Sequence, residues 1–362
     1  MSLAARIRER IRLEGPMSVA EYMTLALLDP THGYYPTRDP RDPGLGEGGD
    51  FITAPEISQM FGELLGLWVL QSWRDMGAPP QVQLVELGPG RGTLMADVLR
   101  SVRLDPALLG ALSIHLVEAS AALQAVQGRT LALSPAPVTM HERLEEVPHA
   151  PTLILGNEFL DCLPIRQLIR RGTTWRERVI TDAGGELAFA ESTSGPGALH
   201  VPDLDAEEGD LLEVRPATAQ LADQLAERFA RYPGRALFID YGPAETEFGD
   251  TLQALRRHEK VDPLAAPGEA DLTSRVDFAQ VAHEARAAGL TVHGPVTQAA
   301  LLSRLGLEVR ASALARANPD AQATLARQLH RLTAPDEMGQ LFKAICLSAV
   351  NLPTPLGFEA PA

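Results

Sequence analysis

The chain has 362 residues, of which 45% are hydrophobic and 22% are charged, so it is long enough for one large or two modest globular domains. Its net charge of −15 argues against a general nucleic-acid-binding protein and is compatible with a basic protein substrate. It has only two cysteines and no run of ~18 apolar residues, so we expect a protein of a reducing compartment such as the cytoplasm, without a metal cluster, a disulfide or a membrane span. Its abundant Ala, Arg and Pro are consistent with a bacterial protein.

The first eighty residues are predicted to be mainly helical. Leu3–Leu13 has apolar residues at helical spacing, and Ser18 with Glu21 forms a capping-box pattern before a second helix, Val19–Leu28. A loop rich in Pro, Gly and charge follows, and Ile57–Trp73 then has the pattern of a long, largely apolar helix. We expect residues 1–80 to form a helical N-terminal extension.

The most informative stretch is Val82–Thr93, which reads Val-Gln-Leu-Val-Glu-Leu-Gly-Pro-Gly-Arg-Gly-Thr. An apolar run typical of a buried parallel strand leads directly into Gly88, Gly90 and Gly92, and a helical pattern follows. A strand, a glycine turn and a helix are the first half of a nucleotide-binding βαβ unit, because glycines permit a sharp turn and close approach of a ligand.

The order of the glycines distinguishes between nucleotides. Dinucleotide-binding folds use G-x-G-x-x-G, but the third position here is Thr93, which disfavours a NAD-linked oxidoreductase. The order found, Glu-x-Gly-x-Gly-x-Gly, resembles motif I of the S-adenosylmethionine (SAM) methyltransferases with a Rossmann-like fold. Glu86 would then help to neutralise the positive charge of SAM. The alternative is an ordinary strand-to-helix turn of an α/β protein.

Acidic and amide side chains follow two further predicted strands. Glu118 ends the strand that begins at Ser113, where an acid suits the ribose hydroxyls of an adenosine. Asn157, Glu158 and Asp161 follow the buried run Thr152–Gly156. The carboxyl ends of parallel strands line the ligand crevice, so we expect these side chains to contact ligand or substrate. A solvated acid and a structural strand-end cap are the simpler alternatives.

The remainder of the chain is predicted to complete an α/β core, residues 81–350, with two insertions. Alternating residues indicate an antiparallel meander inserted at about 165–215, and an irregular, polar insert is expected at about 243–275. Ala236–Ile239 and Phe342–Ser348 are predicted core strands, and the polar group Asp240 follows the first of them. Residues 351–362 form a tail.

Taken together, these features resemble a known family, the bacterial and mitochondrial SAM-dependent methyltransferases that include the mitochondrial complex I assembly factor 7, a protein arginine methyltransferase. The resemblance covers roughly residues 10–350. It rests on these stretches: Asp29-Pro30, Gly33–Tyr35, Gly49–Glu56, Phe61-Gly62, Val85–Met95, Val117–Ser120, Asn157–Pro164, Asp240–Gly242, Asp271–Thr273 and Met338-Gly339.

The resemblance implies a fold, a cofactor and an activity. The fold is a seven-stranded, Rossmann-like class I SAM methyltransferase sheet with a helical N-terminal extension and inserted β/α elements. The cofactor is SAM, and the reaction of the mitochondrial members is methylation of an arginine on a complex I subunit. For a bacterial member the acceptor does not follow from the fold, so a protein substrate of that kind is an expectation, and a homo-oligomer stays open.

The resemblance also implies roles for individual residues. Glu158, supported by Asp161, is expected to grip and orient a guanidinium for catalysis. The cofactor is expected to contact Glu86, Gly88, Gly90, Gly92, Glu118, Asn157 and Thr53, with Tyr34–Thr53 folding over it as a lid. The alternative functions are a small-molecule methyltransferase and a non-catalytic SAM-binding assembly factor.

Overall fold

The computed structural model describes residues 1–37, 53–193, 195, 197, 199, 201–256 and 259–359. Most of the lid expected at Tyr34–Thr53 lies outside these residues, and only its two ends, Tyr34–Thr37 and Thr53, are described. None of the helices in the described ranges has the length and apolar character needed to cross a bilayer. The described residues also contain no group of three or more side chains arranged to bind a metal ion.

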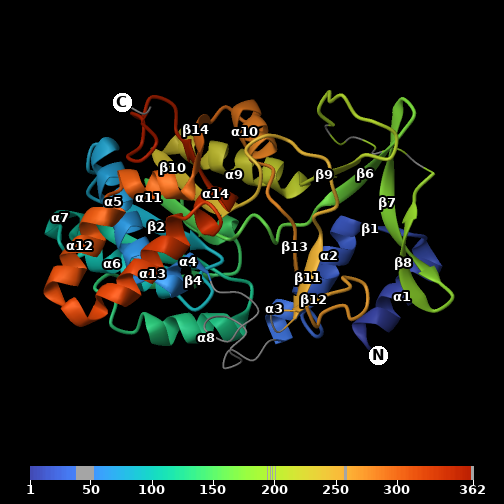
Figure 1. Cartoon of the computed structure of the whole chain (residues 1–362), viewed down its shortest axis with the longest axis horizontal. Helices are drawn as coiled ribbons and strands as arrows, with labels where there is room; N and C mark the ends of the chain where they lie inside the picture. The colour runs from blue at the N-terminus through green and yellow to red at the C-terminus, as the bar shows by residue number, and fades with distance from the viewer. Residues whose placement is uncertain are drawn as a thin grey trace.

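A seven-stranded sheet forms the centre of the larger lobe (Figure 1). Five neighbouring strands are parallel and β15 runs antiparallel to both of its neighbours. The order across the sheet is β4 (Val138–His141), β3 (Leu112–Val117), β2 (Val82–Leu87), β5 (Thr152–Asn157), β10 (Gly234–Tyr241), β15 (Phe342–Ser348) and β14 (Thr291–Thr297). The predicted fold class, including a seven-stranded sheet, is confirmed.

Helices cover both faces of this sheet, which explains why all six residues of β2 are buried. One face packs against α5 (Gln59–Asp75) and α6 (Thr93–Val102), and the other against α9 (Pro216–Arg231) and α10 (Phe278–Ala287). Two glycines one turn apart on α5 allow α6 to approach closely. A Cβ on Gly62 would lie 2.5 Å from Asp97 Cβ, and one on Gly66 would lie 2.6 Å from Val98 O.

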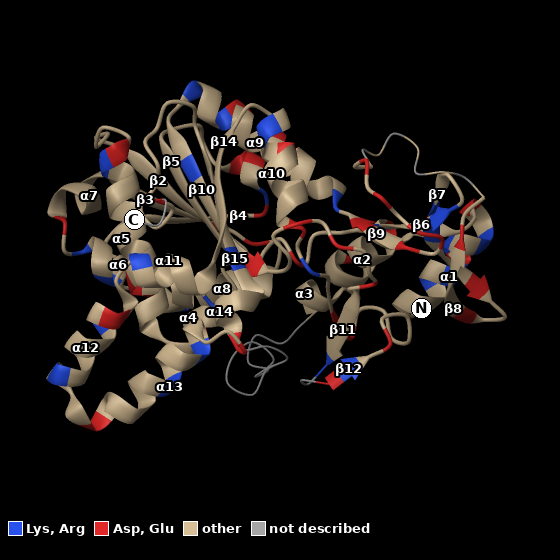
Figure 2. Ribbon diagram, turned by 45° about the horizontal axis from the view of Figure 1, so that its top comes forward, with Lys and Arg blue, Asp and Glu red and all other residues tan. Residues whose placement is uncertain are grey.

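Further helices complete the larger lobe. Two of them, α12 and α13, extend away from the sheet as a hairpin (Figure 2). The helices are α4 (Ala54–Ile57), α7 (Pro106–Ala111), α8 (Ala121–Thr130), α11 (Gln298–Arg304), α12 (Leu307–Ala317), α13 (Gln322–Thr333) and α14 (Met338–Leu341), with 3₁₀ turns at Leu144–Glu146 and Pro319–Ala321.

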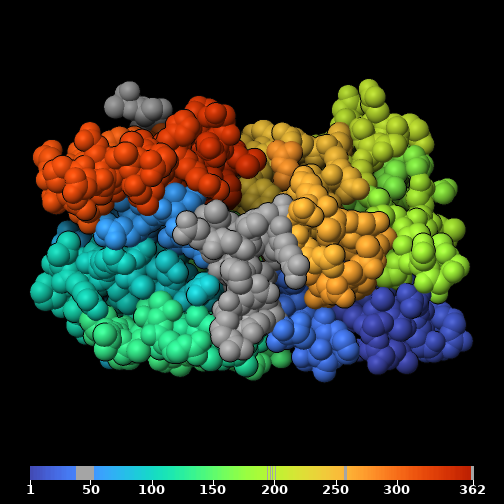
Figure 3. Space-filling model, turned by 60° about the horizontal axis from the view of Figure 1, so that its bottom comes forward, coloured from blue at the N-terminus to red at the C-terminus, as the bar shows by residue number. Residues whose placement is uncertain are grey.

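A smaller lobe combines the N-terminal helices with the two insertions. Helices α1 (Leu3–Glu14) and α2 (Val19–Leu28) share one hydrophobic cluster with residues of both insertions, including Ile165, Ile180 and Leu272. Its larger sheet contains β1 (Met17–Ser18), β6 (Arg166–Arg171), β7 (Thr174–Ala183), β8 (Glu186–Glu191) and β9 (Leu211–Val214). Figure 3 shows the blue N-terminal helices beside the orange second insertion on the surface of this lobe.

The structure therefore divides the chain differently from the sequence-based boundaries. Residues 1–80 do not behave as one extension, because α1 and α2 pack in the smaller lobe whereas α4 and α5 pack on the central sheet. The stretch 243–275, expected to be irregular, contains a three-stranded sheet of β11 (Gln253–Arg256), β12 (Glu259–Val261) and β13 (Asp271–Thr273). These strands are only three or four residues long, too short to leave a clear alternation in the sequence.

Candidate active site

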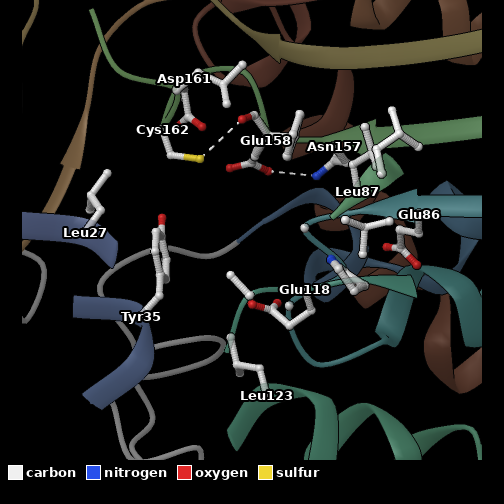
Figure 4. Close-up of a pocket in the computed structure, with 18 of the residues that line it drawn as sticks. Leu27, Tyr35, Glu86, Leu87, Glu118, Leu123, Asn157, Glu158, Asp161 and Cys162 are labelled. Carbon is white, nitrogen blue, oxygen red and sulfur yellow. Dashed lines mark hydrogen bonds between the residues drawn. The ribbon is translucent and has the colours of Figure 1, made fainter. Parts of the chain in front are cut away.

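A cavity of about 440 Å³ lies where the two lobes meet, at the carboxyl ends of β2, β3 and β5. Its lining contains residues from the glycine turn, from the segment after β5, and from α2, α3 (Tyr34–Thr37) and β13. Figure 4 shows side chains from both lobes facing this space. The expected site residues that line it are Thr53, Glu86, Gly88, Gly90, Glu118, Asn157, Glu158 and Asp161.

The glycine turn requires glycines for conformational reasons. Gly88, Gly90 and Gly92 have φ values of +63°, +52° and +79°, in the left-handed region that other residues rarely adopt. A Cβ at Gly90 would meet nothing within 4 Å, so this glycine borders open space in the cavity. Gly92 is not among the cavity-lining residues; it is the left-handed N-cap of α6. The geometry therefore does not favour the expected direct contact between Gly92 and the cofactor.

Glu86 is a buried carboxyl group that still faces the cavity. Only 3% of the residue is exposed, and its Oε2 atom has no hydrogen-bond partner. Burial raises the pKa of this carboxyl to about 8, and a hydrogen bond from the Met95 backbone only partly opposes that shift. An orphaned carboxylate oxygen beside a cavity fits a ligand that supplies a positive N–H donor, as the ammonium group of SAM does.

Glu118 directly follows β3 and is held by Ser120, the N-cap residue of α8, and by Gln127 within that helix. Its Oε1 accepts the backbone N–H of Ser120 at 2.8 Å, and its Oε2 accepts Gln127 Nε2 at 3.3 Å. Burial raises its pKa to about 7 despite these hydrogen bonds. The same Gln127 amide donates to Gly90 O at 2.9 Å, which ties the glycine turn to Glu118. Nothing in the sequence distinguishes Gln127 from the other polar residues of its helix.

Glu158 has an unusual backbone conformation at the end of β5. Its φ is +51°, which is strained for a residue with a side chain. The sheet nevertheless holds it, because its N–H donates to Ile239 O on β10 at 2.8 Å. Its Oε1 accepts Asn157 Nδ2 at 3.1 Å, whereas Asn157 Oδ1 is buried without a partner. Burial, reinforced by the charge of Asp161, raises the pKa of Glu158 to about 8.

Asp161 lies on the same turn as Glu158, and residues outside the cavity lining hold this turn in place. Burial raises its pKa to about 6, and the nearby guanidinium of Arg215 and a hydrogen bond from Tyr241 oppose the shift. The turn is fixed by Asp240, whose Oδ2 accepts the N–H groups of Leu160 at 2.8 Å and of Asp161 at 3.1 Å. Asp240 is fully buried and does not line the cavity, so it positions the turn.

The smaller lobe contributes residues that sequence analysis did not single out as functional. Tyr35 lines the cavity and donates its hydroxyl to Asp271 Oδ1 at 3.0 Å. Cys162, from the turn after β5 in the larger lobe, lies on the same side of the cavity as Tyr35 (Figure 4). Tyr35, Cys162 and Asp271 lie in sequence stretches that carry the family resemblance, but none of them was predicted to be a site residue. Thr53, which sequence analysis did select, lines the cavity and precedes α4, where its N–H donates to Glu56 Oε2 at 3.3 Å.

The comparisons with known proteins identify the family. The family described as "Putative S-adenosyl-L-methionine-dependent methyltransferase" matches residues 64–296, which include the glycine turn and Glu158. The chain belongs to this methyltransferase family. Curated relatives agree: the chain is 39% identical to the protein arginine methyltransferase NDUFAF7 homolog of Drosophila melanogaster, over 96% of this chain and 84% of that protein. It is 36% identical to protein arginine methyltransferase NDUFAF7 of Homo sapiens, with 93% and 81% covered.

Two solved structures of proteins from Burkholderia thailandensis have the same fold over nearly the whole chain. One is bound to S-adenosyl-homocysteine (SAH) and has a TM-score of 0.86 at 28% identity, covering 99% of this chain and 95% of that one. A native structure gives a TM-score of 0.84 at 28% identity, with 99% and 94% covered. This methyltransferase therefore uses SAM as its cofactor, and the predicted family and cofactor are confirmed.

Proposed function

We propose that this SAM-dependent methyltransferase transfers a methyl group to the guanidinium of an arginine on a protein, of the kind represented by a respiratory complex I subunit, in the bacterial cytoplasm. The observation that carries the proposal is the charge of the cavity. Among the residues that the structure describes, eight acidic side chains and two arginines line it. Burial raises the pKa of Glu158 and that of Asp161, the latter despite the nearby Arg215 guanidinium, and a cationic acceptor would supply further positive charge.

The cofactor residues divide by the part of SAM that each suits. Glu86, with its orphaned Oε2, is suited to the methionine ammonium, and Glu118 is suited to the ribose hydroxyls. Gly90 has no side chain and so leaves open space in which the cofactor can approach the glycine turn. When bound, SAM supplies an electrophilic methyl group, and the protein's part is positioning and electrostatics.

Glu158 and Asp161 are proposed to act on the acceptor. A guanidinium is always protonated in water and presents a planar set of N–H donors, which a carboxylate can grip in a fixed orientation. Glu158 would hold one acceptor nitrogen toward the methyl group and accept the proton that this nitrogen releases. Its strained backbone and its hydrogen bond from Asn157 restrict where that carboxylate can lie.

The names of the relatives support the arginine acceptor, since the curated proteins from Drosophila melanogaster and Homo sapiens are both protein arginine methyltransferases. The test is incubation of the protein with labelled SAM and a whole bacterial extract, followed by mass spectrometry that identifies the labelled proteins, residues and small molecules. Methylarginine supports the proposal. Label confined to small molecules would favour a small-molecule methyltransferase. SAM binding without any transfer would favour a non-catalytic assembly factor.

A further inference from the structure

One wall of the cavity belongs to the smaller lobe, and its position is set by packing. Thr24, Leu27 and Leu28 of α2 line it together with Tyr35 and Asp271. Neighbours of these residues are core residues of the smaller lobe: Tyr34 is 6% exposed and Leu272 is 2% exposed, and both belong to the cluster that contains α1 and α2. The wall is therefore part of a packed lobe and is not a loose loop.

Tyr35 and Asp271 are joined across 236 positions of the chain. The Tyr35 hydroxyl donates to Asp271 Oδ1 at 3.0 Å, which holds the carboxyl group in the cavity wall. Burial, with the charge of Asp271, raises the pKa of Tyr35 well above its usual value, so the hydroxyl keeps its proton and stays a donor. Figure 4 shows the Tyr35 ring projecting into the cavity toward the side that carries Cys162 and Glu158.

The same end of the cavity contains the acceptor carboxyls. The N–H of Ser274, directly after β13, donates to Asp161 O at 3.0 Å, which brings the turn after β5 next to the strand that carries Asp271. Asp161 follows β5 in the larger lobe, and Asp271 belongs to β13 in the smaller lobe. Carboxyl groups from two lobes, together with an aromatic ring that lines the same cavity, form a site for a flat cation, since a guanidinium can donate along its edges and stack on a ring.

We propose that Tyr35 and Asp271 are the acceptor-recognition pair of the smaller lobe: Asp271 accepts N–H groups of the acceptor guanidinium, and the Tyr35 ring packs along its plane. The inference rests on the proposed function and deepens it. The pair selects a planar cation with several donors over the compact ammonium of lysine and over a neutral group of the same shape. Glu158 acts on the reacting nitrogen, whereas Tyr35 and Asp271 set affinity and choice of acceptor.

The experiment uses the full chain saturated with SAH and three end-blocked peptides that differ in one residue. Gly-Gly-Arg-Gly-Gly is compared with its lysine and citrulline counterparts by calorimetry. The wild-type protein is expected to prefer arginine over both. Asp271→Asn is expected to weaken the arginine peptide at least tenfold and to reduce the arginine-to-lysine preference, while the Kd for SAH stays within twofold. Tyr35→Phe, which removes only the hydroxyl, is expected to weaken the arginine peptide several-fold.

Glu269→Gln is the matched control, because Glu269 lies two residues from Asp271 on the same lobe, is exposed and does not line the cavity. It is expected to leave all three affinities unchanged. Wild-type protein that does not prefer arginine over citrulline would contradict the proposed function. A wild-type preference that persists in both Asp271→Asn and Tyr35→Phe would overturn only the assignment of this pair. If Asp271→Asn also loses SAH binding, Tyr35→Phe decides the outcome alone.

Discussion

Asp240 Oδ2 accepts the backbone N–H of Asp161 at 3.1 Å, which links the end of β10 to the turn that follows β5. The same oxygen accepts the N–H of Leu160, and Oδ1 accepts the N–H of Tyr241 at 2.9 Å. A buried carboxylate therefore satisfies three backbone donors at once. Because the turn carries Glu158 with its strained backbone, the position of the proposed catalytic carboxylate depends on a residue outside the cavity.

Asp240→Asn tests this dependence. The amide keeps one acceptor oxygen but replaces the other with a donor that faces backbone N–H groups, and a buried N–H left without its acceptor costs about 1–3 kcal/mol. We expect kcat to fall at least tenfold while the Kd for SAM changes little. Steady-state kinetics and calorimetry measure the two quantities. A variant with normal kcat would show that the turn does not need Asp240.

Glu158→Gln tests the proposed catalytic carboxylate itself. The substitution keeps the shape of the side chain and removes its ability to accept a proton, a function usually worth 10²–10⁴ in rate. We expect kcat to fall at least a hundredfold with SAM affinity near that of the wild type. Glu142→Gln is the control, because Glu142 also lines the cavity but is exposed. Comparable losses in both variants would point to general charge rather than to Glu158.

Gly90→Val tests the space reserved for the cofactor. Gly90 lines the cavity with φ +52°, so a valine there introduces both bulk and backbone strain of about 1–2 kcal/mol. Gly172→Val separates these effects, because Gly172 has φ +57°, meets nothing within 4 Å and lies in the β6–β7 turn away from the cavity. Both variants are expected to lose similar stability in thermal unfolding. Only Gly90→Val is expected to abolish SAM binding.

The main strands of the central sheet and the position of the glycine turn could be predicted because they leave local patterns in the sequence. An apolar run followed by three glycines specifies a buried strand and a left-handed turn, and the polar residues after β3 and β5 then lie at one edge of the sheet. Eight of the nine expected site residues line the cavity, and the exception, Gly92, serves as a helix cap.

The smaller lobe could not be predicted, because its contacts are distant in the sequence. Tyr35 contacts Asp271 only when α2 and α3 pack against the short strand β13. Neither segment has a sequence pattern from which this contact could be predicted. The strained backbone of Glu158 could not be predicted from the sequence either, since a non-glycine residue at φ +51° has no local sequence signal. Gln127 and Asp240 act through backbone groups that become neighbours only in the fold.

The raised pKa of Glu86 predicts that cofactor binding depends on pH. Its pKa is about 8 in the folded protein and about 4.3 in an unfolded chain, so between these values the folded state retains a proton that the unfolded state has lost. The free energy of unfolding of the cofactor-free protein is therefore expected to fall as pH rises through this window. A cationic group at Oε2 favours the ionised carboxylate, lowers its pKa and releases that proton. SAH binding is accordingly expected to tighten from pH 6 to pH 8.

Glu86→Gln isolates this contribution from Glu118 and Glu158, whose raised pKa values give a pH dependence of the same sign. The variant cannot titrate at this position, so its SAH affinity is expected to vary less between pH 6 and pH 8. The variant is also expected to release fewer protons than the wild type when it binds SAH. Calorimetry in two buffers of different ionisation enthalpy measures proton release directly. If the variant released as much proton as the wild type, the cofactor ammonium would have to be placed elsewhere, because Glu86 would then keep its proton in the complex.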